Sequence, residues 1–131
     1  MIFVDSNIPM YLVGAPHPNK DAARRALELI ITRGERMVTS AEVLQEILHR
    51  YHALKRTDAI QPALDALLGV VDEVYAVELE DVQRAKDVMM GMAKLSARDA
   101  LHVAVMKRRG IRRVLSFDAG FDAVGWVERV A

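Results

Sequence analysis

The stretch IFVDSN, at residues 2–7, carries a short apolar run straight into an aspartate and two small polar residues. Consecutive apolar residues indicate a buried strand, whereas Asp, Ser and Asn favour caps and turns. We therefore predict a strand that ends at Asp5, followed by a short helix capped by Ser6 or Asn7, with Pro9 in its first turn.

The same order of short strand and longer helix recurs along the chain. Further strands are predicted at 37–39, 74–77, 114–117 and 126–130, and helices at 21–31, after Ser40, at 63–68, at 80–95 and from Ser96 to Gly110. This alternation predicts an α/β fold of three layers, with a short, mostly parallel central sheet covered by helices on both faces. We expect residues 1–131 to form a single domain.

The composition narrows the classes of function. Lys plus Arg and Asp plus Glu number 18 each, so the net charge is zero and a strongly basic nucleic-acid coat is excluded. The absence of cysteine excludes thiol catalysis and thiolate zinc sites. No apolar run has the length of a transmembrane helix, and the first residues do not resemble a signal peptide. These features predict a soluble, cytoplasmic protein that does not enter a membrane.

Four acidic residues stand where a parallel sheet would bring them together. Asp5 and Asp118 directly follow apolar strands, Asp99 lies at a helix N-terminus, and Glu46 lies in the helix after the second strand. Ligands of open α/β sheets gather outside the carboxyl ends of the strands. Grouped carboxylates raise one another's pKa, and a hard divalent cation relieves this repulsion. We predict a Mg²⁺ or Mn²⁺ site that activates water for phosphodiester hydrolysis.

Each acid also has a purely structural explanation. Asp5 and Asp118 could cap turns after their strands. Glu46 lies off the predicted apolar stripe of Leu44, Ile47, Leu48 and Tyr51, so it could face solvent. Asp99 could complete a capping box with Ser96. Among the other candidates, Asp122, His49 and His52 are expected at the surface, and His102 is expected in the core with its hydrogen bonds satisfied.

Four segments carry a family resemblance. They are FVDSN at 3–7, SAEVLQE at 40–46, LSARDALH at 95–102, and SFD at 116–118 followed by Phe121 and Asp122. In this order and spacing they resemble the motifs of PIN-domain ribonucleases of the VapC toxin type, across essentially the whole chain. The resemblance selects Glu46 over Glu42 as the second acid, and it assigns Asp5, Asp99 and Asp118 as the others.

The resemblance implies an endoribonuclease toxin that depends on Mg²⁺ or Mn²⁺, acts on RNA as a homodimer and is neutralised by a cognate antitoxin. Asp5, Asp99 and Asp118 would bind the metal, with Asn7 and Ser116 as supporting groups. Arg98 and Arg50 are the candidate RNA contacts, and most other cations are expected in surface salt pairs. Because aromatic residues make up only 5% of the chain, base stacking is not expected.

Two alternatives use the same sequence features. A metal-dependent DNA nuclease or phosphatase could employ the same acidic pocket. A catalytically silent module that binds a protein partner would need no metal at all. Excess apolar surface on the helices near residues 26–31 and 44–54 supports a partner of some kind, and a second copy of the chain is the occupant we expect.

Overall fold

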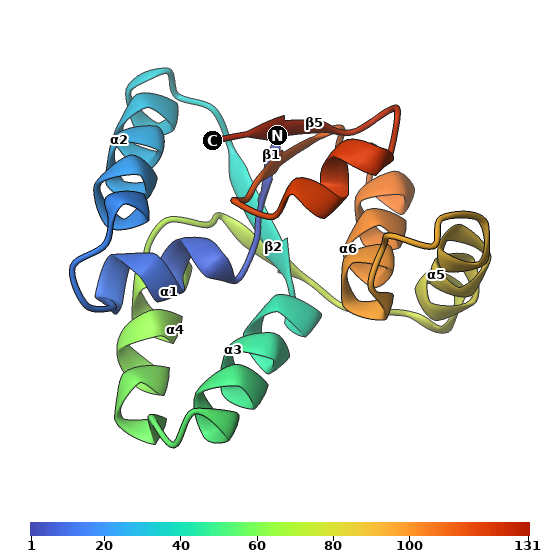
Figure 1. Cartoon of the computed structure of the whole chain (residues 1–131). Helices are drawn as coiled ribbons and strands as arrows, with labels where there is room; N and C mark the ends of the chain where they lie inside the picture. Colours follow the sequence, from blue (N-terminus) through green and yellow to red (C-terminus); the bar gives the residue numbers. More distant parts are fainter.

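The computed structural model describes residues 1–131, and its centre is a five-stranded sheet (Figure 1). The strands are β1 (Ile2–Val4), β2 (Met37–Ser40), β3 (Glu73–Tyr75), β4 (Arg113–Leu115) and β5 (Glu128–Val130). Their order is β3-β2-β1-β4-β5, and every neighbouring pair is parallel. The predicted mostly parallel sheet is therefore wholly parallel.

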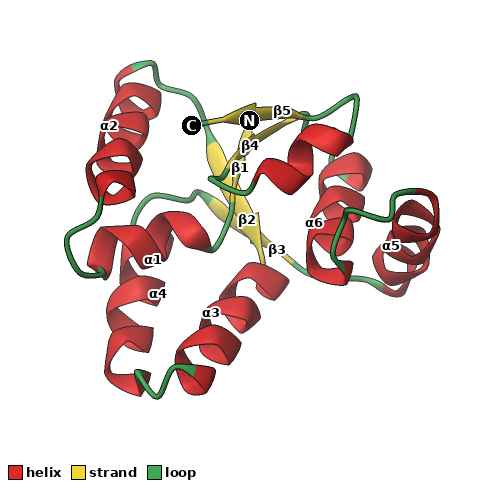
Figure 2. Cartoon of the chain, in the orientation of Figure 1, coloured by secondary structure: helices red, strands yellow, loops and turns green.

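Six helices cover the sheet. They are α1 (Asn7–Val13), α2 (Pro18–Thr32), α3 (Ala41–Ala53), α4 (Ile60–Leu68), α5 (Leu79–Gly91) and α6 (Ala97–Arg108), with short 3₁₀ turns at Thr57–Ala59 and Ala119–Ala123. Figure 2 shows α1 to α4 on one side of the strands and α5 and α6 on the other, so the predicted three α/β/α layers are confirmed. None of these helices combines the length and the apolarity needed to cross a membrane.

Burial on both faces explains the apolar strands. All three residues of β1, the middle strand, have no exposed surface, as expected where helices cover both sides of a parallel sheet. They join a core cluster of 28 buried apolar residues that includes Ile47 of α3 and Met106 of α6. Removal of this apolar surface from water is the main favourable contribution to folding.

The chain order reverses at the boundary between β1 and β4. From β1 the chain moves outward to β2 and β3, and then returns to β4 on the other side of β1. The register pairs Val4 with Leu115, and the Asp5 N–H donates to the Leu115 carbonyl at 3.1 Å. Asp5 and Ser116 therefore leave the sheet side by side, at the kind of crevice where open α/β sheets bind ligands.

Three helices differ from the sequence prediction. Helix α4 begins at Ile60 rather than Ala63. Helix α2 begins at Pro18 rather than Asp21, because Nδ1 of His17 accepts the Asn19 N–H at 3.0 Å and proline fits the first helical position. Helix α5 ends at Gly91 instead of Leu95. The predicted inward residues Val82 and Met89 are exposed, whereas Asp81 is buried in an ion pair with Arg108 of α6.

Candidate functional site

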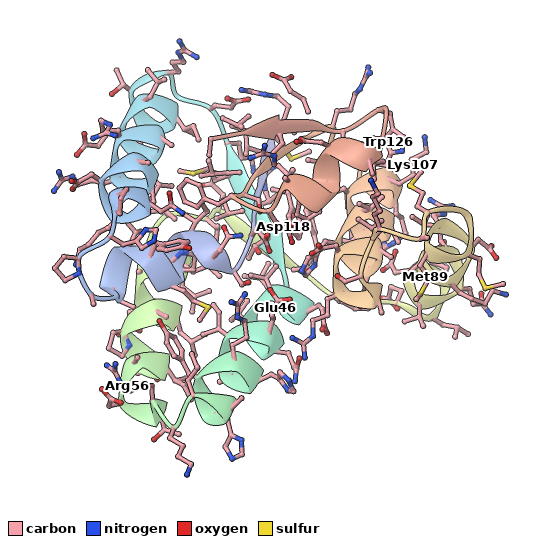
Figure 3. All side chains as sticks on the ribbon, viewed as in Figure 1. Glu46, Arg56, Met89, Lys107, Asp118 and Trp126 are labelled. Carbon is pink, nitrogen blue, oxygen red and sulfur yellow. The ribbon has the colours of Figure 1, made fainter.

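An acidic pocket of about 450 Å³ opens at the carboxyl edge of the sheet, beside the ends of β1 and β4. All four predicted acids line it, although they come from four separate parts of the chain. In Figure 3 the labelled Glu46, from α3, and Asp118, from the loop after β4, face the same central space. The lining residues are Asp5, Ser6, Asn7, Glu46, Arg50, Ser96, Ala97, Arg98, Asp99 and Asp118.

Asp5 is held by a network of hydrogen bonds. Its carboxylate accepts bonds from the Ser6 N–H at 2.8 Å, the Ser116 hydroxyl at 2.6 Å and Nδ2 of Asn7 at 3.3 Å. The Ser116 oxygen in turn accepts from Nδ2 of Asn7 at 3.1 Å and from the Asp118 N–H at 3.0 Å. Asn7 and Ser116, the predicted supporting groups, thus fix the orientation of one acid and tie it to the loop that carries another.

Glu46 is 7% exposed, so the solvated reading of this residue is wrong. Its Oε1 accepts a hydrogen bond from the Ser6 hydroxyl. The Ser6 side chain makes this contact instead of capping α1. The buried side of α3 carries Val43, Ile47 and Tyr51 together with Glu46, whereas Leu48 of the predicted stripe is 44% exposed. The helix is therefore rotated so that its acid meets the pocket.

Asp99 combines a structural and an electrostatic role. The Ser96 hydroxyl accepts the Asp99 N–H at 3.1 Å and so caps α6, but the Asp99 carboxylate faces the pocket. Only half of the predicted capping box is present, because no reciprocal bond reaches the Ser96 N–H. Burial, the adjoining Asp118 carboxyl and the charges of Asp5 and Glu46 raise the pKa of Asp99 to about 8. Metal-free, this pocket holds more negative charge than its surroundings stabilise.

Asp118 caps the turn that follows it and also lines the pocket. Its Oδ1 accepts the Gly120 N–H at 2.8 Å, as the turn interpretation predicts, without removing the residue from the pocket wall. Asp122 behaves differently. It is exposed and binds the Arg129 guanidinium through two contacts of 3.0 Å, outside the pocket.

His102 is a feature that the sequence reasoning missed. It is fully buried as expected, but neither ring nitrogen has a hydrogen-bond partner, so the expectation of satisfied bonds is wrong. Its Nε2 lies 3.7 Å from Oδ1 of Asp5, and ligand atoms of Asp5, Glu46 and His102 all lie within 4.8 Å of one another. The signal was its place three residues after Asp99, on the same face of α6.

The donor set fits a hard divalent cation. It consists of grouped carboxylates and one orphaned imidazole, and an ion would supply the positive charge that the pocket lacks. Burial also raises the pKa of Asp5, a shift that His102 and the Ser116 hydrogen bond oppose and that the charge of Glu46 reinforces. Both raised pKa values reflect burial and neighbouring carboxylates, and a bound cation would oppose these shifts.

Two cations border the acids. Arg50 and Arg98 line the pocket and form no ion pair, whereas some other arginines pair with acids outside it. Arg56 pairs with Asp58 at 3.1 Å, and Arg113 pairs with Glu35. The expectation that most cations form surface salt pairs is wrong, because only seven of the 18 lysines and arginines do so. Arg50 and Arg98 are the unpaired arginines that line the acidic pocket, as the sequence analysis selected.

The comparison with family models identifies the class of proteins to which this parallel sheet and acidic pocket belong. The PIN domain family model matches residues 2–127. The chain therefore belongs to the PIN-domain family, as the four motifs predicted.

Comparison with individual relatives places the chain within a subgroup of this family. The chain is 60% identical to Ribonuclease VapC13 of Mycobacterium tuberculosis over 131 residues, which is 100% of both chains. It is 42% identical to Ribonuclease VapC23 of the same species over 118 residues, covering 90% of this chain and 93% of the relative. The crystal structure of M. tuberculosis VapC20, described as a sarcin-ricin loop cleaving toxin, superposes with a TM-score of 0.80 at 28% identity, covering 98% of each chain. Within the PIN-domain family, the chain groups with the VapC ribonucleases.

Proposed function

We propose that this protein is an endoribonuclease that uses Mg²⁺ or Mn²⁺ and forms the toxin component of a toxin–antitoxin pair. The observation that carries the proposal is the pocket itself, in which four carboxylates converge and the pKa of Asp99 rises to about 8. The full-length identity to VapC ribonucleases supports RNA as the substrate. We treat residues 1–131 as one cytoplasmic domain.

Asp5, Asp99 and Asp118 would hold the ion, because their carboxylates border the pocket from β1, α6 and the loop after β4. When bound, the ion supplies positive charge that lowers the pKa of a nearby water and offsets the phosphate charge. Asn7 and Ser116 keep the Asp5 carboxylate in one orientation. Glu46, held by Ser6, presents a buried carboxylate whose Oε atoms can accept the proton of the attacking water.

Arg50 and Arg98 complete the proposed site from the substrate side. Both line the acidic pocket without an ion-pair partner, so their guanidinium groups can bind the phosphate oxygens of RNA. Such contacts position the backbone but do not read sequence. In this proposal the acids take part in the reaction and the two arginines bind the substrate.

A cleavage assay tests the proposal directly. Wild-type protein is incubated with total RNA and purified tRNAs in the presence of Mg²⁺, Mn²⁺ or EDTA, beside single-stranded DNA and small phosphate esters. We expect RNA cleavage with either ion and none with EDTA. Preferred cleavage of DNA or phosphate esters would instead establish the alternative nuclease or phosphatase. A protein that cleaves nothing but binds its partner would be the silent module.

The toxin assignment predicts a second protein. We expect a short DNA-binding antitoxin to be encoded beside this chain and to inhibit RNA cleavage at an equimolar ratio. Co-purification of the two proteins, followed by the cleavage assay before and after addition of the antitoxin, measures this. Full activity in the stable complex would contradict the toxin–antitoxin reading while leaving the ribonuclease reading intact.

A homodimer is the expected assembly. Leu29 and Ile31 of α2 are 50% and 57% exposed, and Leu48 of α3 and the adjoining Leu54 are 44% and 63% exposed. A second copy could cover such side chains through an isologous interface. We expect sedimentation velocity to show a dimer at tens of micromolar. A monomer at that concentration would count against this assembly.

The hydrogen-bond network around Asp5 gives a matched pair of serine variants. Ser116→Ala removes one donor to Asp5 and one acceptor for Asn7 and Asp118. We expect RNA cleavage to fall about 10–100-fold, as is typical for groups that support metal ligands. Ser40→Ala is the control, because the Ser40 hydroxyl is buried without a partner. It should retain wild-type cleavage and stability; an equal loss in both variants would contradict the supporting role of Ser116.

A further inference from the structure

A second pocket of about 450 Å³ adjoins the acidic pocket, and we call it the aromatic pocket. Its walls include Tyr11, His17, Tyr51 and Phe117, together with Asn7 and Arg50. Asn7 and Arg50 also line the acidic pocket, so the two cavities share a wall. A ligand that occupies one of them can therefore extend into the other.

Three of the four rings of the aromatic pocket pack against one another. Tyr11 lies against His17 with ring centroids 4.9 Å apart and meets Phe117 edge to face at 5.3 Å. His17 is fixed in place because its Nδ1 caps α2, and Tyr51 is buried at 7% exposure. Flat aromatic surfaces that are held in fixed positions stack on planar ligands with little loss of conformational freedom.

Adjacent residues and the Asn7 side chain connect the two pockets. Phe117 directly precedes Asp118, and its N–H donates to Oδ1 of Asn7 at 3.3 Å. The same Asn7 side chain donates to Asp5 through Nδ2. One asparagine therefore connects an acid of the acidic pocket to a ring of the aromatic pocket. A group attached to a phosphate at the acids could therefore reach these rings across the shared wall.

The chemistry of the shared wall indicates what occupies the aromatic pocket. An occupant that uses both pockets must carry an anionic group for Arg50 beside a flat, mostly apolar group for the rings. A nucleotide has this combination of charge and shape, and the volume lies within the usual range for small-ligand sites. An apolar side chain of a protein partner would fill the aromatic pocket but leave Arg50 unpaired.

We propose that the aromatic pocket binds the base of a nucleotide that flanks the phosphate held at the acids. This proposal rests on the proposed ribonuclease function and deepens it, because it makes base stacking a determinant of where RNA is cut. The low aromatic content of the chain argued against stacking, but composition counts rings and does not show where the fold places them. Two of its three tyrosines and one of its three phenylalanines line this one cavity.

A binding experiment that needs no catalysis tests the proposal. Metal-free protein is titrated with AMP, GMP, CMP and UMP, and with ribose 5-phosphate as the probe that lacks a base, while NMR shifts are recorded. We expect at least one nucleotide to bind about tenfold tighter than ribose 5-phosphate, as a stacked base typically contributes. Shifts should centre on His17 and Phe117. Equal binding of all five probes would overturn the proposal.

Variants locate the effect. Tyr11→Leu removes a ring but keeps apolar bulk, and His17→Asn removes a ring but keeps a side chain that can cap α2. In both variants, nucleotides should bind no more tightly than ribose 5-phosphate. If Tyr11→Leu does not fold, the result for His17→Asn tests the proposal. Trp126→Leu, which removes a ring outside both pockets, is the control and should bind like the wild type. An unchanged preference for nucleotides over ribose 5-phosphate in His17→Asn would overturn the assignment.

Cleavage assays separate this proposal from the proposed function. An RNA with an abasic ribose beside the cleaved bond should be cut about tenfold more slowly than intact RNA by the wild type, and at the same rate as intact RNA by Tyr11→Leu. Wild-type protein that cleaves both RNAs equally would refute the base site while leaving the ribonuclease established. Nucleotide binding without any cleavage would support the base site and refute the ribonuclease function. Weakened antitoxin binding with unchanged nucleotide binding would assign the pocket to a protein partner instead.

Discussion

The variant Asp99→Asn should lose metal-dependent RNA cleavage and, without metal, become more stable than the wild type at neutral and alkaline pH. Loss of a group that supports a ligand already costs about 10–100-fold, so loss of a ligand itself should exceed about 100-fold. The gain in stability follows from the crowded charge of the pocket, because Asn resembles the protonated acid in size and carries no charge. Cleavage rates and metal-free thermal melts measure the two effects.

The pH dependence of this gain has a definite sign. The pKa of Asp99 is about 8 in the folded protein, against 3.8 for an unperturbed aspartate. Between those pH values the folded state holds a proton that the unfolded state has released, so wild-type stability falls as the pH rises from about 4 to about 8. Asparagine does not titrate. The difference in melting temperature between variant and wild type should therefore widen over this interval and level off above it.

Two comparisons distinguish the loss of a metal ligand from the loss of any negative charge. Asp122→Asn also removes one negative charge, but from an exposed residue that pairs with Arg129 outside the pocket, so cleavage should be unaffected. Mn²⁺ should raise the melting temperature of the wild type and of Asp122→Asn much more than that of Asp99→Asn. If Asp99 served only the helix N-terminus, its substitution would cost about 1 kcal/mol or less and leave cleavage intact.

The acids could be predicted because topology alone brings them together. Asp5 and Asp118 follow strands that pair in register, and Asp99 begins the helix that precedes β4. In a parallel sheet these three positions share an edge whatever the details of packing. Glu46 is a fourth candidate from the same argument, and the motif resemblance selects it over Glu42, although the apolar pattern of α3 by itself places it toward solvent. A buried acid interrupts such a pattern, so periodicity alone misplaces functional residues on helices.

Other features depend on packing between distant segments, which no local pattern encodes. His102 looks like a core residue in the sequence, and only the approach of Asp5 from β1 makes it part of the site. The aromatic pocket joins α1, the loop before α2, α3 and the loop after β4, so no single segment of the sequence indicates it. Asp81 of α5 forms a buried ion pair with Arg108 of α6 that the apolar pattern of α5 does not predict.

That ion pair leads to the second large expected effect, this time on folding. Asp81 is 1% exposed and accepts two bonds from Arg108, at 2.7 and 2.9 Å, and one from the Glu78 N–H at 2.8 Å. Arg108→Met leaves a buried carboxylate without its partner. We expect the melting temperature at neutral pH to fall by at least about 10 °C. Folded Arg108→Met should cleave RNA at the wild-type rate, because neither residue lines the pocket.

The same substitution should weaken the effect of pH on this part of the protein. Burial raises the pKa of Asp81, but the bonds from Arg108 and the Glu78 N–H outweigh it and hold that pKa below its usual value. In the wild type the pair therefore stabilises the fold above about pH 4 and loses this contribution in acid. Without Arg108, the pKa of Asp81 rises because burial is opposed only by the Glu78 N–H and the charge of Arg109, so the variant gains less stability than the wild type as the pH increases. Melts from pH 3 to pH 8 should show the variant deficit widening with pH, and Arg108→Met should show no such slope when it is added to Asp81→Asn. A deficit independent of pH would mean that Arg108 stabilises the helix pair through packing alone.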